Sequence, residues 1–424
     1  MVSPSTTDDC GCDSVSPSSY LMSVPAAVAL AVAQVAPIAR VETVDLLDAP
    51  GRMAARTVTA TEAMPYFDNS AMDGFALRCA DLVGHDGLPI AGTVSTGDAP
   101  RTLAAGTALR IFTGAPLPQG ADAVAMVERC TESGGFVQVS AAPRWGDNVR
   151  HAGSDQAVGQ TLIAAGTRLA PHHVGLLAAN GIARIDVVRR PRIGVFSTGD
   201  ELQGGTRLPG QIHDANRPML VALARQAGAE VADLGILPDD ACATAAAFAD
   251  LGDRYDLILT SGAVSMGGKD HIRDALLAAG GKVNGWRVAL KPGKPVMFGR
   301  LGRTAITGLP GNPFAALVGF HLFVAPQIAG LSGTAPTPFA RTPALANFDW
   351  TRKPGRAEVF PVRLAAHHTD TGLPMLQRLG DGVSATLLPM SAADGMAIVS
   401  ADTAQIQRGD TLHWQPFCPT GDRS

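Results

Sequence analysis

Two lysines three residues apart, Lys291 and Lys294, flank a Pro-Gly pair in the segment LKPGKP. The chain has 34 lysines and arginines together, but only five are lysines, and four of these fall between Lys269 and Lys294. Arginine presents a planar fork of donors, whereas lysine is a compact point charge that suits a single phosphate or oxyanion oxygen. The clustering therefore predicts an anion-binding site, with two solvated lysines on a turn as the alternative.

A second candidate for anion binding is the loop AVSMGGKDHIRD, which follows the apolar strand DLILTSG. A glycine-rich loop that enters a helix turns backbone amides and the helix dipole toward a ligand. The loop departs from a Walker A motif, because Ala263 replaces its first glycine and Asp270 replaces the hydroxyl residue that would bind magnesium. An ordinary P-loop nucleotidase is disfavoured. Two interpretations remain, a phosphate site or a tight turn with Asp270 as a helix N-cap.

Carboxylates follow three successive apolar strands. Asp200 and Glu201 come after RIGVFST, Asp239 and Asp240 come after EVADLGIL, and Asp270 ends the glycine-rich loop. Magnesium is usually held by one or two carboxylates together with substrate phosphates. This coincidence predicts a metal and phosphate site at the ends of these strands, with Mg²⁺ as the cation. Helix capping is the alternative for at least one member of each pair.

Two further segments carry polar groups at turns. The segment GLPGNPFAALVGF has the order strand, glycine-rich loop and helix start, with Asn312 as the cap and Pro313 in the first turn. The segment PYFDNSAMDGFAL gathers polar side chains around Asp73, and FTGAPLPQGADAV places Thr113 beside a glycine. A well-capped buried helix and ordinary turns are the alternatives.

The elements between these segments predict how they are positioned. From Pro191 the strands RIGVFST, EVADLGIL, DLILTSG and VNGWRVAL alternate with helices, one of them capped by Asn216, and a helix over Pro313 to Leu331 follows. Such alternation is typical of a doubly wound parallel sheet, whose ligands bind beyond the carboxyl ends of the strands. The candidate loops follow those strands, so we expect them to meet there.

We expect a multidomain fold of class α/β and β, with a central doubly wound parallel α/β domain and β-rich modules before and after it. Short apolar runs broken by glycine, proline and aspartate predict the β-rich parts. The expected domains are a disordered leader over 1–20, a linking helical and β domain over 21–57 and 140–189, a small β-rich domain over 58–139, the α/β domain over 190–333 and a β-barrel-like domain over 334–424.

Composition excludes several classes of protein. The apolar share of 46% and charged share of 17% indicate a globular chain, and a net charge of −4 without an arginine run excludes nucleic-acid binding. The apolar segment Leu21 to Val35 lacks a positively charged leader, so secretion is not expected. The stretch Phe314 to Leu331 is interrupted by polar residues and proline, which is poor for a bilayer span. We expect a cytoplasmic protein that binds no membrane.

Other motifs are sparse. Six cysteines exclude a disulfide framework, and we assign Cys10 and Cys12 to the disordered leader. No G-x-S-x-G, H-E-x-x-H or G-x-G-x-x-G occurs, which removes the main support for a serine hydrolase, a zincin or a simple dinucleotide-binding protein. We expect the pair His172 and His173 to cap a helix or face solvent rather than bind a metal.

Seven motifs occur in one order: DNSAMDGFA, IFTGAPLPQGADAV, GDNVRHAGSD, STGDEL, IHDANRPML, SGAVSMGGKD and LKPGKP with GLPGNP. In this order they resemble the molybdopterin molybdenumtransferase family, which includes MoeA and the gephyrin E domain. The resemblance runs from about Met22 to the carboxyl terminus and is weakest in the last domain.

The resemblance implies an activity. Members insert molybdenum from molybdate into adenylylated molybdopterin and release AMP, with a divalent cation, as elongated homodimers of four-domain subunits. It implies that the α/β domain binds molybdopterin and that the linking domain serves dimerisation. Expected partners are molybdenum cofactor adenylyltransferase and molybdoenzyme apoproteins.

The resemblance also implies roles for individual residues. The catalytic residues expected are Asp73, Thr113, Glu201, Asp239 and Asp270, of which Glu201, Asp239 and Asp270 would bind the divalent cation, Mg²⁺. The substrate-binding residues expected are Ser265, Gly267, Arg287, Lys291, Lys294, Pro310, Asn312 and Ser391. In the family the β-rich module of one subunit faces the α/β domain of the other, which would unite Asp73 and Thr113 with the remaining residues.

The sequence departs from the family at two positions. Ala263 stands where many members have a glycine, and Arg287 stands where some members have a lysine, so a paralogue with an altered substrate is a further interpretation. Two rival classes are a molybdopterin adenylyltransferase, disfavoured by the β modules, and a non-catalytic scaffold. A scaffold would not need carboxylates after three strands.

Overall fold

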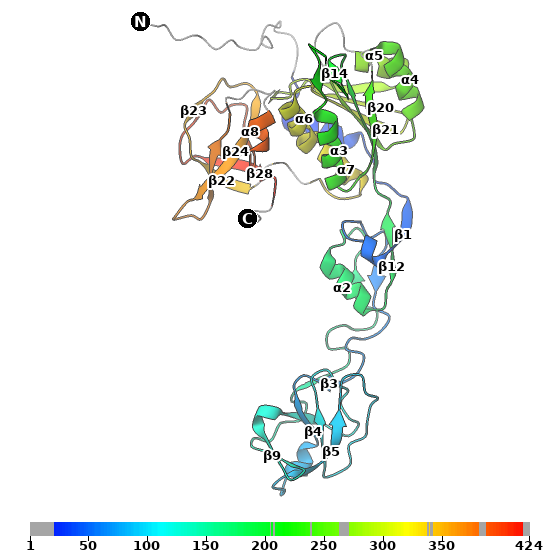
Figure 1. Cartoon of the computed structure of the whole chain (residues 1–424), viewed down its shortest axis with the longest axis vertical. Helices are drawn as coiled ribbons and strands as arrows, with labels where there is room; N and C mark the ends of the chain where they lie inside the picture. Colours follow the sequence, from blue (N-terminus) through cyan, green and yellow to red (C-terminus); the bar gives the residue numbers. More distant parts are fainter. Residues whose placement is uncertain are drawn as a thin grey trace. The chain divides into compact units, whose positions relative to one another are not determined.

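The structure is a computed structural model that describes residues 21–203, 205–206, 208–237, 240–262, 271–336, 339, 342–380 and 387–418. The chain divides into two compact units. Unit 2 is Thr43–Val187, and unit 1 takes the described residues of Met1–Glu42 and Val188–Ser424. Figure 1 shows the elements of both units, coloured along the sequence.

Unit 2 contains a six-stranded sheet in the order β7–β4–β6–β5–β9–β8. Its pairs are antiparallel except β5 with β6, which is parallel. Adjacent residues of β4 pack into different cores, Phe75 into one and Ala76 into another, as expected where side chains alternate across a sheet. The strands are β4 (Gly74–Leu77), β5 (Leu88–Val94), β6 (Ala108–Ile111), β7 (Ala123–Met126), β8 (Cys130–Ser133) and β9 (Phe136–Val139).

The rest of unit 2 is built from short pairs of strands and one helix. Helix α2 (Pro171–Ala179) begins with a proline and packs Leu177 against Leu46, Ile163 and Val187. The strand pairs are β1 (Val41–Asp45) with β12 (Arg184–Val188), β2 (Val58–Thr59) with β11 (Thr161–Ile163) and β3 (Asn69–Ser70) with β10 (Val149–Arg150). These pairs join segments that lie more than 70 residues apart in the sequence, so tertiary contacts define this region.

Unit 1 has an α/β sheet of six strands in the order β16–β13–β17–β21–β20–β18. The pairs β16–β13, β13–β17 and β17–β21 are parallel, whereas β20 runs antiparallel to both of its neighbours. All strands therefore point the same way except β20. Their bounds are β13 (Arg192–Thr198), β16 (Glu230–Leu237), β17 (Leu257–Ser261), β18 (Lys282–Trp286), β20 (Met297–Leu301) and β21 (Thr304–Leu309).

Helices cover both faces of this sheet (Figure 1). On one face Val195 and Leu259 pack with α3 (Asn216–Gln226), α6 (Pro313–Gly319) and α7 (Ala325–Leu331). On the other face Phe196 and Ile258 pack with α4 (Ala241–Leu251) and α5 (His271–Ala278). Neighbouring residues of one strand thus enter opposite cores, which explains why the strands are apolar throughout.

The helix after β21 is a core element. It runs over Pro313–Leu331 as α6, the π-helical segment Phe320–Val324 and α7. Gln327 is fully buried, accepts a hydrogen bond from Thr307 of β21 and donates one to Ala31 O of α1 (Val24–Ala33). By length and composition alone the helix could cross a membrane, but 78% of its apolar window is buried inside unit 1. It packs as the core helix of a globular unit.

The last part of unit 1 is a β-barrel. Its sheet has the order β19–β24–β25–β22–β28–β26, and β26 also pairs with β24, so the strands β24, β25, β22, β28 and β26 form a closed ring. Trp414, Phe360 and Leu376 fill its core. The strands are β22 (Thr342–Ala346), β24 (Ala357–His367), β25 (Pro374–Arg378), β26 (Gly395–Val399) and β28 (Thr411–Pro416), with β19 (Leu290–Lys291) added outside the ring. A separate pair joins β23 (Trp350–Thr351) to β27 (Gln405–Ile406).

The predicted fold class is confirmed, with three local corrections. The strand predicted over VNGWRVAL is two strands, β18 and the separate β19, because the chain turns at Arg287 in a left-handed conformation with φ 68°. The antiparallel strand β20 was not predicted. The N-cap of α3 is Ala215 rather than Asn216, and the first-turn amide of Arg217 bonds to Asp214 instead. The domain boundaries stay a prediction.

Candidate functional site

Three glycine-containing loops follow β13, β17 and β21 at the carboxyl edge of the α/β sheet. Two of them approach so closely that a side chain would clash, since a Cβ on Gly262 would lie 2.3 Å from Thr198 O. A Cβ on Gly199 would lie 2.6 Å from Glu201 Oε1. Both glycines also have positive φ angles, 147° at Gly199 and 94° at Gly262. Glycine is therefore required at both positions, and the loops converge as predicted for a ligand site.

Asn216 connects two of these loops. Its side-chain amide donates to Ser261 Oγ over 2.8 Å and to Gly311 O over 2.7 Å, and the residue is buried. Sequence reasoning missed this role, because asparagine before an apolar helix is typical of an N-cap. The motif IHDANRPML was part of the family resemblance, and this was the only signal that pointed to the residue.

Several buried polar atoms at this edge have no hydrogen-bond partner among the described residues. They are Ser197 Oγ, Thr198 Oγ1, Thr260 Oγ1 and Asn216 Oδ1. Buried polar groups are normally hydrogen-bonded, and a group of unpartnered ones near one strand edge needs an explanation. A polar ligand at the carboxyl edge would supply partners, and this supports the location predicted for the site.

The predicted carboxylates fall into two groups. Glu201 is exposed and follows β13, where its side chain lies over Gly199. Asp240 is the N-cap of α4, since its carboxylate accepts a 2.7 Å bond from Ala243 N, so the capping alternative holds for this member of its pair. The other predicted residues of these loops, Asp239, Ser265, Gly267 and Asp270, lie outside the described residues.

The described residues alone do not form a complete binding site for a divalent cation. They contain no group of three or more His, Cys, Asp or Glu side chains that could hold a metal ion. Of the predicted metal ligands only Glu201 is among them. A single carboxylate would hold magnesium only together with further ligands, such as substrate phosphates.

The two lysines of LKPGKP are placed differently from the prediction. Lys291 lies in β19, which pairs with the barrel strand β24, so it is not at the end of an α/β strand. Lys294 is half-buried and has no side-chain hydrogen bond or ion pair to any other described residue. Between them Gly293 has φ 108°, and a Cβ there would lie 3.9 Å from Ala315 O of α6. The loop thus lies against the helix that begins at Pro313.

The remaining substrate-binding candidates of unit 1 that the structure describes are Pro310, Asn312, Ser391 and Arg287. Pro310 is buried and accepts a 3.4 Å bond from Ser261, and Asn312 is the residue at the N-cap of α6, as predicted. Ser391 is the exposed last residue of α8 (Leu387–Ser391), whose Met390 packs against a cluster that includes Phe314. Arg287 is half-buried, its Nε has no hydrogen-bond partner among the residues that the structure describes, and its positive φ is uncommon for a bulky residue.

Asp73 and Thr113 form a second constellation, in unit 2. Gly74 of β4 pairs with Ile111 of β6, which brings the residues around these strand ends together. Asp73 Oδ1 accepts bonds from Thr113 N at 2.7 Å and Thr113 Oγ1 at 2.8 Å. The backbone amide of Thr113, and then its hydroxyl, hold the pKa of Asp73 below its usual value. Both side chains are exposed, so a carboxylate is presented at the surface of this unit.

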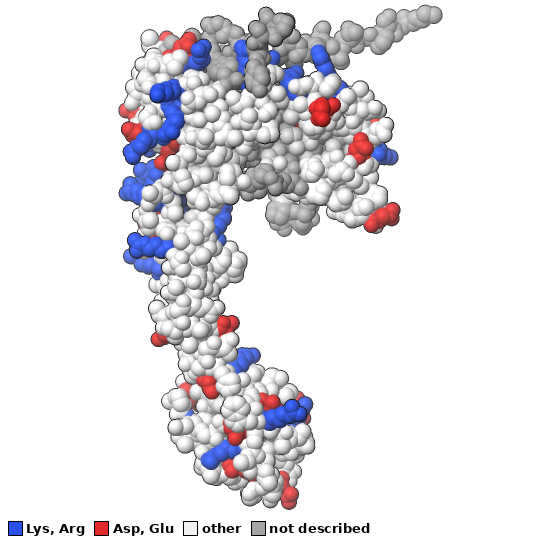
Figure 2. Space-filling model, turned by 180° about the vertical axis from the view of Figure 1, so that it is seen from behind, with Lys and Arg blue, Asp and Glu red and all other residues white. Residues whose placement is uncertain are grey.

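Other polar groups of unit 2 have local partners. Asp68 accepts from Ala152 N and lies 3.2 Å from His151, and the amide of Ala152 is the main reason that the pKa of Asp68 is lowered. On the face in Figure 2, acidic and basic side chains are interspersed over the β-rich module. Two of the ion pairs in this module join Arg78 to Asp81 and Arg110 to Glu132.

The histidine pair caps a helix. His173 Nδ1 accepts a bond from Ala170 N at 3.0 Å, and His172 Nε2 lies 3.1 Å from His173 Nε2. A neutral His173 that accepts at Nδ1 carries its proton on Nε2, where it can donate to His172. A metal ion between the two Nε2 atoms would displace that proton, so this arrangement matches the predicted capping role.

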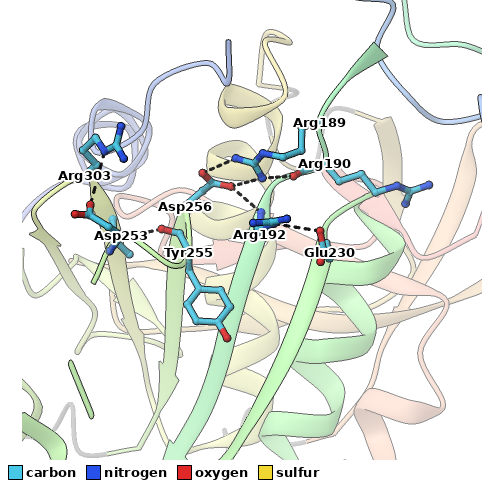
Figure 3. Close-up of polar contacts among 9 residues, drawn as sticks. Arg189, Arg190, Arg192, Glu230, Asp253, Tyr255, Asp256 and Arg303 are labelled. Carbon is cyan, nitrogen blue, oxygen red and sulfur yellow. Dashed lines mark hydrogen bonds and ion pairs between the residues drawn. The ribbon is translucent and has the colours of Figure 1, made fainter. Parts of the chain in front are cut away.

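The amino edge of the same α/β sheet is built on ion pairs (Figure 3). Arg189 donates to both carboxylate oxygens of Asp256, at 3.0 and 2.9 Å, and Arg192 N donates to Asp256 over 2.7 Å. The Arg192 side chain lies 3.4 Å from Glu230 at the start of β16. The charged side chains at the starts of these strands are therefore paired with one another.

Three family models match the chain in order. They are described as MoeA N-terminal region (domain I and II), over residues 22–181, probable molybdopterin binding domain, over residues 194–330, and MoeA C-terminal region (domain IV), over residues 343–417. The Haemophilus influenzae protein named molybdopterin molybdenumtransferase is 35% identical over 384 residues, which is 89% of this chain and 94% of the relative. The chain belongs to the molybdopterin molybdenumtransferase family.

Further members of the molybdopterin molybdenumtransferase family agree over most of the chain. The Mycobacterium tuberculosis protein named molybdopterin molybdenumtransferase 2 is 36% identical over 388 residues, with 87% of this chain and 93% of the relative covered. The crystal structure of the molybdopterin biosynthesis MoeA protein from Pyrococcus horikoshii has a TM-score of 0.78 at 27% identity, and covers 94% of this chain and 100% of that one. The family predicted from the seven motifs is therefore confirmed.

Proposed function

We propose that the protein inserts molybdenum from molybdate into adenylylated molybdopterin and releases AMP. Relatives that are 35 and 36% identical over most of their length are named molybdopterin molybdenumtransferases, which supports the transfer of molybdenum. The release of AMP is inferred from the family resemblance and from the chemistry of an adenylylated substrate. The observation that carries the proposal is the match of all three family models in one order across the chain.

The carboxyl edge of the α/β sheet is the proposed substrate site. Its loops converge at glycines, Asn216 ties two of them together, and buried hydroxyls there lack partners. Cleaving a phosphoanhydride asks mainly for positioning and neutralisation of charge. Lys291 and Lys294 are the proposed binding groups for phosphate or molybdate oxygens, since a lysine ammonium suits a single oxyanion oxygen.

The residues of unit 2 are proposed to act in the same reaction from a second subunit. Asp73 and Thr113 are exposed and hydrogen-bonded to each other, so an ionised carboxylate is available to a neighbouring surface. The homodimer, and the completion of each site by the partner, rest on the family resemblance. The expected further partners, an adenylyltransferase and molybdoenzyme apoproteins, and the cytoplasmic location rest on it as well.

The dependence on Mg²⁺ remains part of the proposal. Asp239 and Asp270 would have to join Glu201, and no step above depends on the cation. Activity measured after treatment with a chelator, with and without added Mg²⁺, tests this dependence.

The experiment that tests the proposed function combines purified protein, adenylylated molybdopterin and molybdate. We expect stoichiometric AMP and a product that activates a molybdoenzyme apoprotein. Omission of molybdate is the control, because activation of the apoprotein must depend on the metal. Absence of both AMP and activation would reject the catalytic proposal and favour the scaffold class.

A further inference from the structure

Lys291 is held in place by the barrel. Strand β19, which contains it, pairs in parallel with β24 so that Leu290 lies opposite Ala357 and Lys291 lies opposite Glu358. Glu358 also pairs with Val399 of β26, so its backbone lies between two neighbouring strands. The main chain of Lys291 is therefore held by β24, which is itself paired with β26 on its other side.

The side chain of Glu358 extends this control to the ammonium group. Its Oε1 lies 3.3 Å from Lys291 Nζ, and its Oε2 lies 3.1 Å from Arg352 Nε. The Glu358 side chain is only 4% exposed, whereas that of Lys291 is 46% exposed. The carboxylate is thus inside the protein, and it reaches a lysine whose other side faces solvent.

Arg352 fixes the carboxylate in turn. Its Nη1 donates to Ser400 O at 3.0 Å and to Thr403 O at 2.5 Å, and its Nη2 donates to Arg356 O. Because the guanidinium is planar and its Nε, Nη1 and Nη2 atoms all donate hydrogen bonds, it holds Glu358 in one orientation. A buried carboxylate costs free energy unless it is paired, and Arg352 supplies that pairing without help from Lys291. The contact with Lys291 therefore adds a second partner to a carboxylate that Arg352 already pairs.

The two lysines of the loop differ in this respect. Glu358 takes one donor direction of the Lys291 ammonium and leaves the others available, since an ammonium has three donors. Lys294 has no comparable partner among the residues that the structure describes. A long side chain that is already ordered loses less conformational entropy when it binds a ligand.

We propose that Glu358 is a positioning residue for Lys291, which it orients from inside the barrel toward an oxyanion ligand. The proposal rests on the proposed function, which gives Lys291 such a ligand. Glu358 itself does not touch the anion, and its negative charge makes it unsuitable to do so. It acts through the ammonium that it holds.

A double-mutant cycle with molybdate as the probe tests this role. Calorimetry would measure molybdate affinity for wild type, Glu358→Gln, Lys291→Ala and the double variant. We expect Glu358→Gln to weaken binding about tenfold, which corresponds to about 1.4 kcal/mol. In the Lys291→Ala background the same change should have no further effect, because coupled residues are not additive. Glu358→Asp keeps the charge and should recover part of the affinity.

The matched control is Asp256→Asn at the amino edge. It replaces another arginine-bound carboxylate by an amide, so it should lower the melting temperature and leave molybdate affinity unchanged. Wild-type affinity in Glu358→Gln, or an undiminished effect of this change in the Lys291→Ala background, would overturn the positioning role.

A second readout separates this inference from the proposed function. With five lysines in the chain, protein labelled with ¹³C at lysine Cε gives few signals, and Lys291→Arg assigns that of Lys291. Glu358→Gln should move the Lys291 signal and leave that of Lys282 in place. If wild type binds no molybdate, the proposed function fails, and an unmoved Lys291 signal would then reject the positioning as well.

Discussion

The two edges of the α/β sheet in unit 1 differ in whether their polar groups have hydrogen-bond partners among the described residues. At the amino edge Asp256 accepts three bonds from Arg189 and Arg192, and the Arg192 side chain pairs with Glu230. At the carboxyl edge buried hydroxyls such as Ser197 and Thr260 have no partner among the described residues. Saturated groups stabilise a fold, whereas open ones are retained where a ligand supplies the partner. The contrast agrees with the proposal that the carboxyl edge binds substrate while the amino edge stabilises the sheet.

Substitution of one carboxylate at each edge should have opposite effects on turnover and on stability. Glu201→Ala should reduce turnover at least about a hundredfold, the scale for groups at a reacting centre, with the melting temperature close to that of wild type. Asp256→Asn should leave turnover per folded molecule unchanged but cost about 2 kcal/mol of unfolding free energy, because charge-assisted bonds are lost. Denaturant unfolding and AMP release measure both. A stable, fully active Glu201→Ala variant would remove the carboxyl edge from the reaction.

The lysines of LKPGKP offer a finer test of the proposed substrate site. Lys291→Arg and Lys294→Arg should each reduce turnover about tenfold although the charge is kept, because a guanidinium fork does not replace a point charge. Alanine at either position should weaken binding of adenylylated molybdopterin. Lys282→Arg, on the edge strand β18, is the matched control and should have wild-type kinetics. Wild-type kinetics in both arginine variants would show that only charge matters.

Whether unit 2 joins the carboxyl edge can be tested by mixing inactive chains. If Asp73 completes the site of a partner subunit, hybrid dimers of Asp73→Ala and Glu201→Ala chains keep one intact site of two. Random exchange should then restore about a quarter of wild-type activity, as expected for a two-fold symmetric dimer. AMP release after proven subunit exchange is the measurement. No recovery would mean that each site is built within one chain.

The smallest effect concerns the charge of Asp73. Its pKa lies below the usual 3.8 because the amide of Thr113, and then its hydroxyl, donate to the carboxylate. A lowered pKa in the folded state means that the associated stability is present above 3.8 and is lost only as the pH falls through the lower, folded value. Thr113→Val should move the titration of Asp73 upward, and the remaining backbone bond should keep it below 3.8. Carboxyl ¹³C spectra follow it, and an unshifted titration would contradict the assigned cause.

The sequence was sufficient for the large elements of unit 1. Strands β13, β16 and β17 are apolar throughout and separated by helices, a pattern that predicts a buried parallel sheet. The core helix Pro313–Leu331 begins at a proline after an asparagine, and this start was predicted for the same reason. Local pattern decides these features, so they can be read from neighbouring residues.

The missed features depend on distant residues. Strand β19 consists of two residues, and only its pairing with β24, more than sixty residues later, defines it. Asn216 carries a side chain that suits an N-cap, and only the position of Ser261 and Gly311 gives it a different role. Glu358 was not singled out at all, since a lone glutamate in an apolar strand has no motif around it. These residues become visible only when the strands are placed beside one another.

The π-helical segment Phe320–Val324 adds one extra residue to the core helix Pro313–Leu331. A π turn accommodates an extra residue between two α-helical stretches. A regular α-helix over the same residues would rotate everything after it by about 100°. Gln327 would then turn away from Thr307 and Ala31, which it now joins. Deletion of one residue inside the π segment should therefore preserve the helical phase of α7, whereas the same deletion within α6 should disrupt the core. The effect of a deletion therefore depends on its position along this helix. A chain that lacks one residue of the π segment can keep the same core.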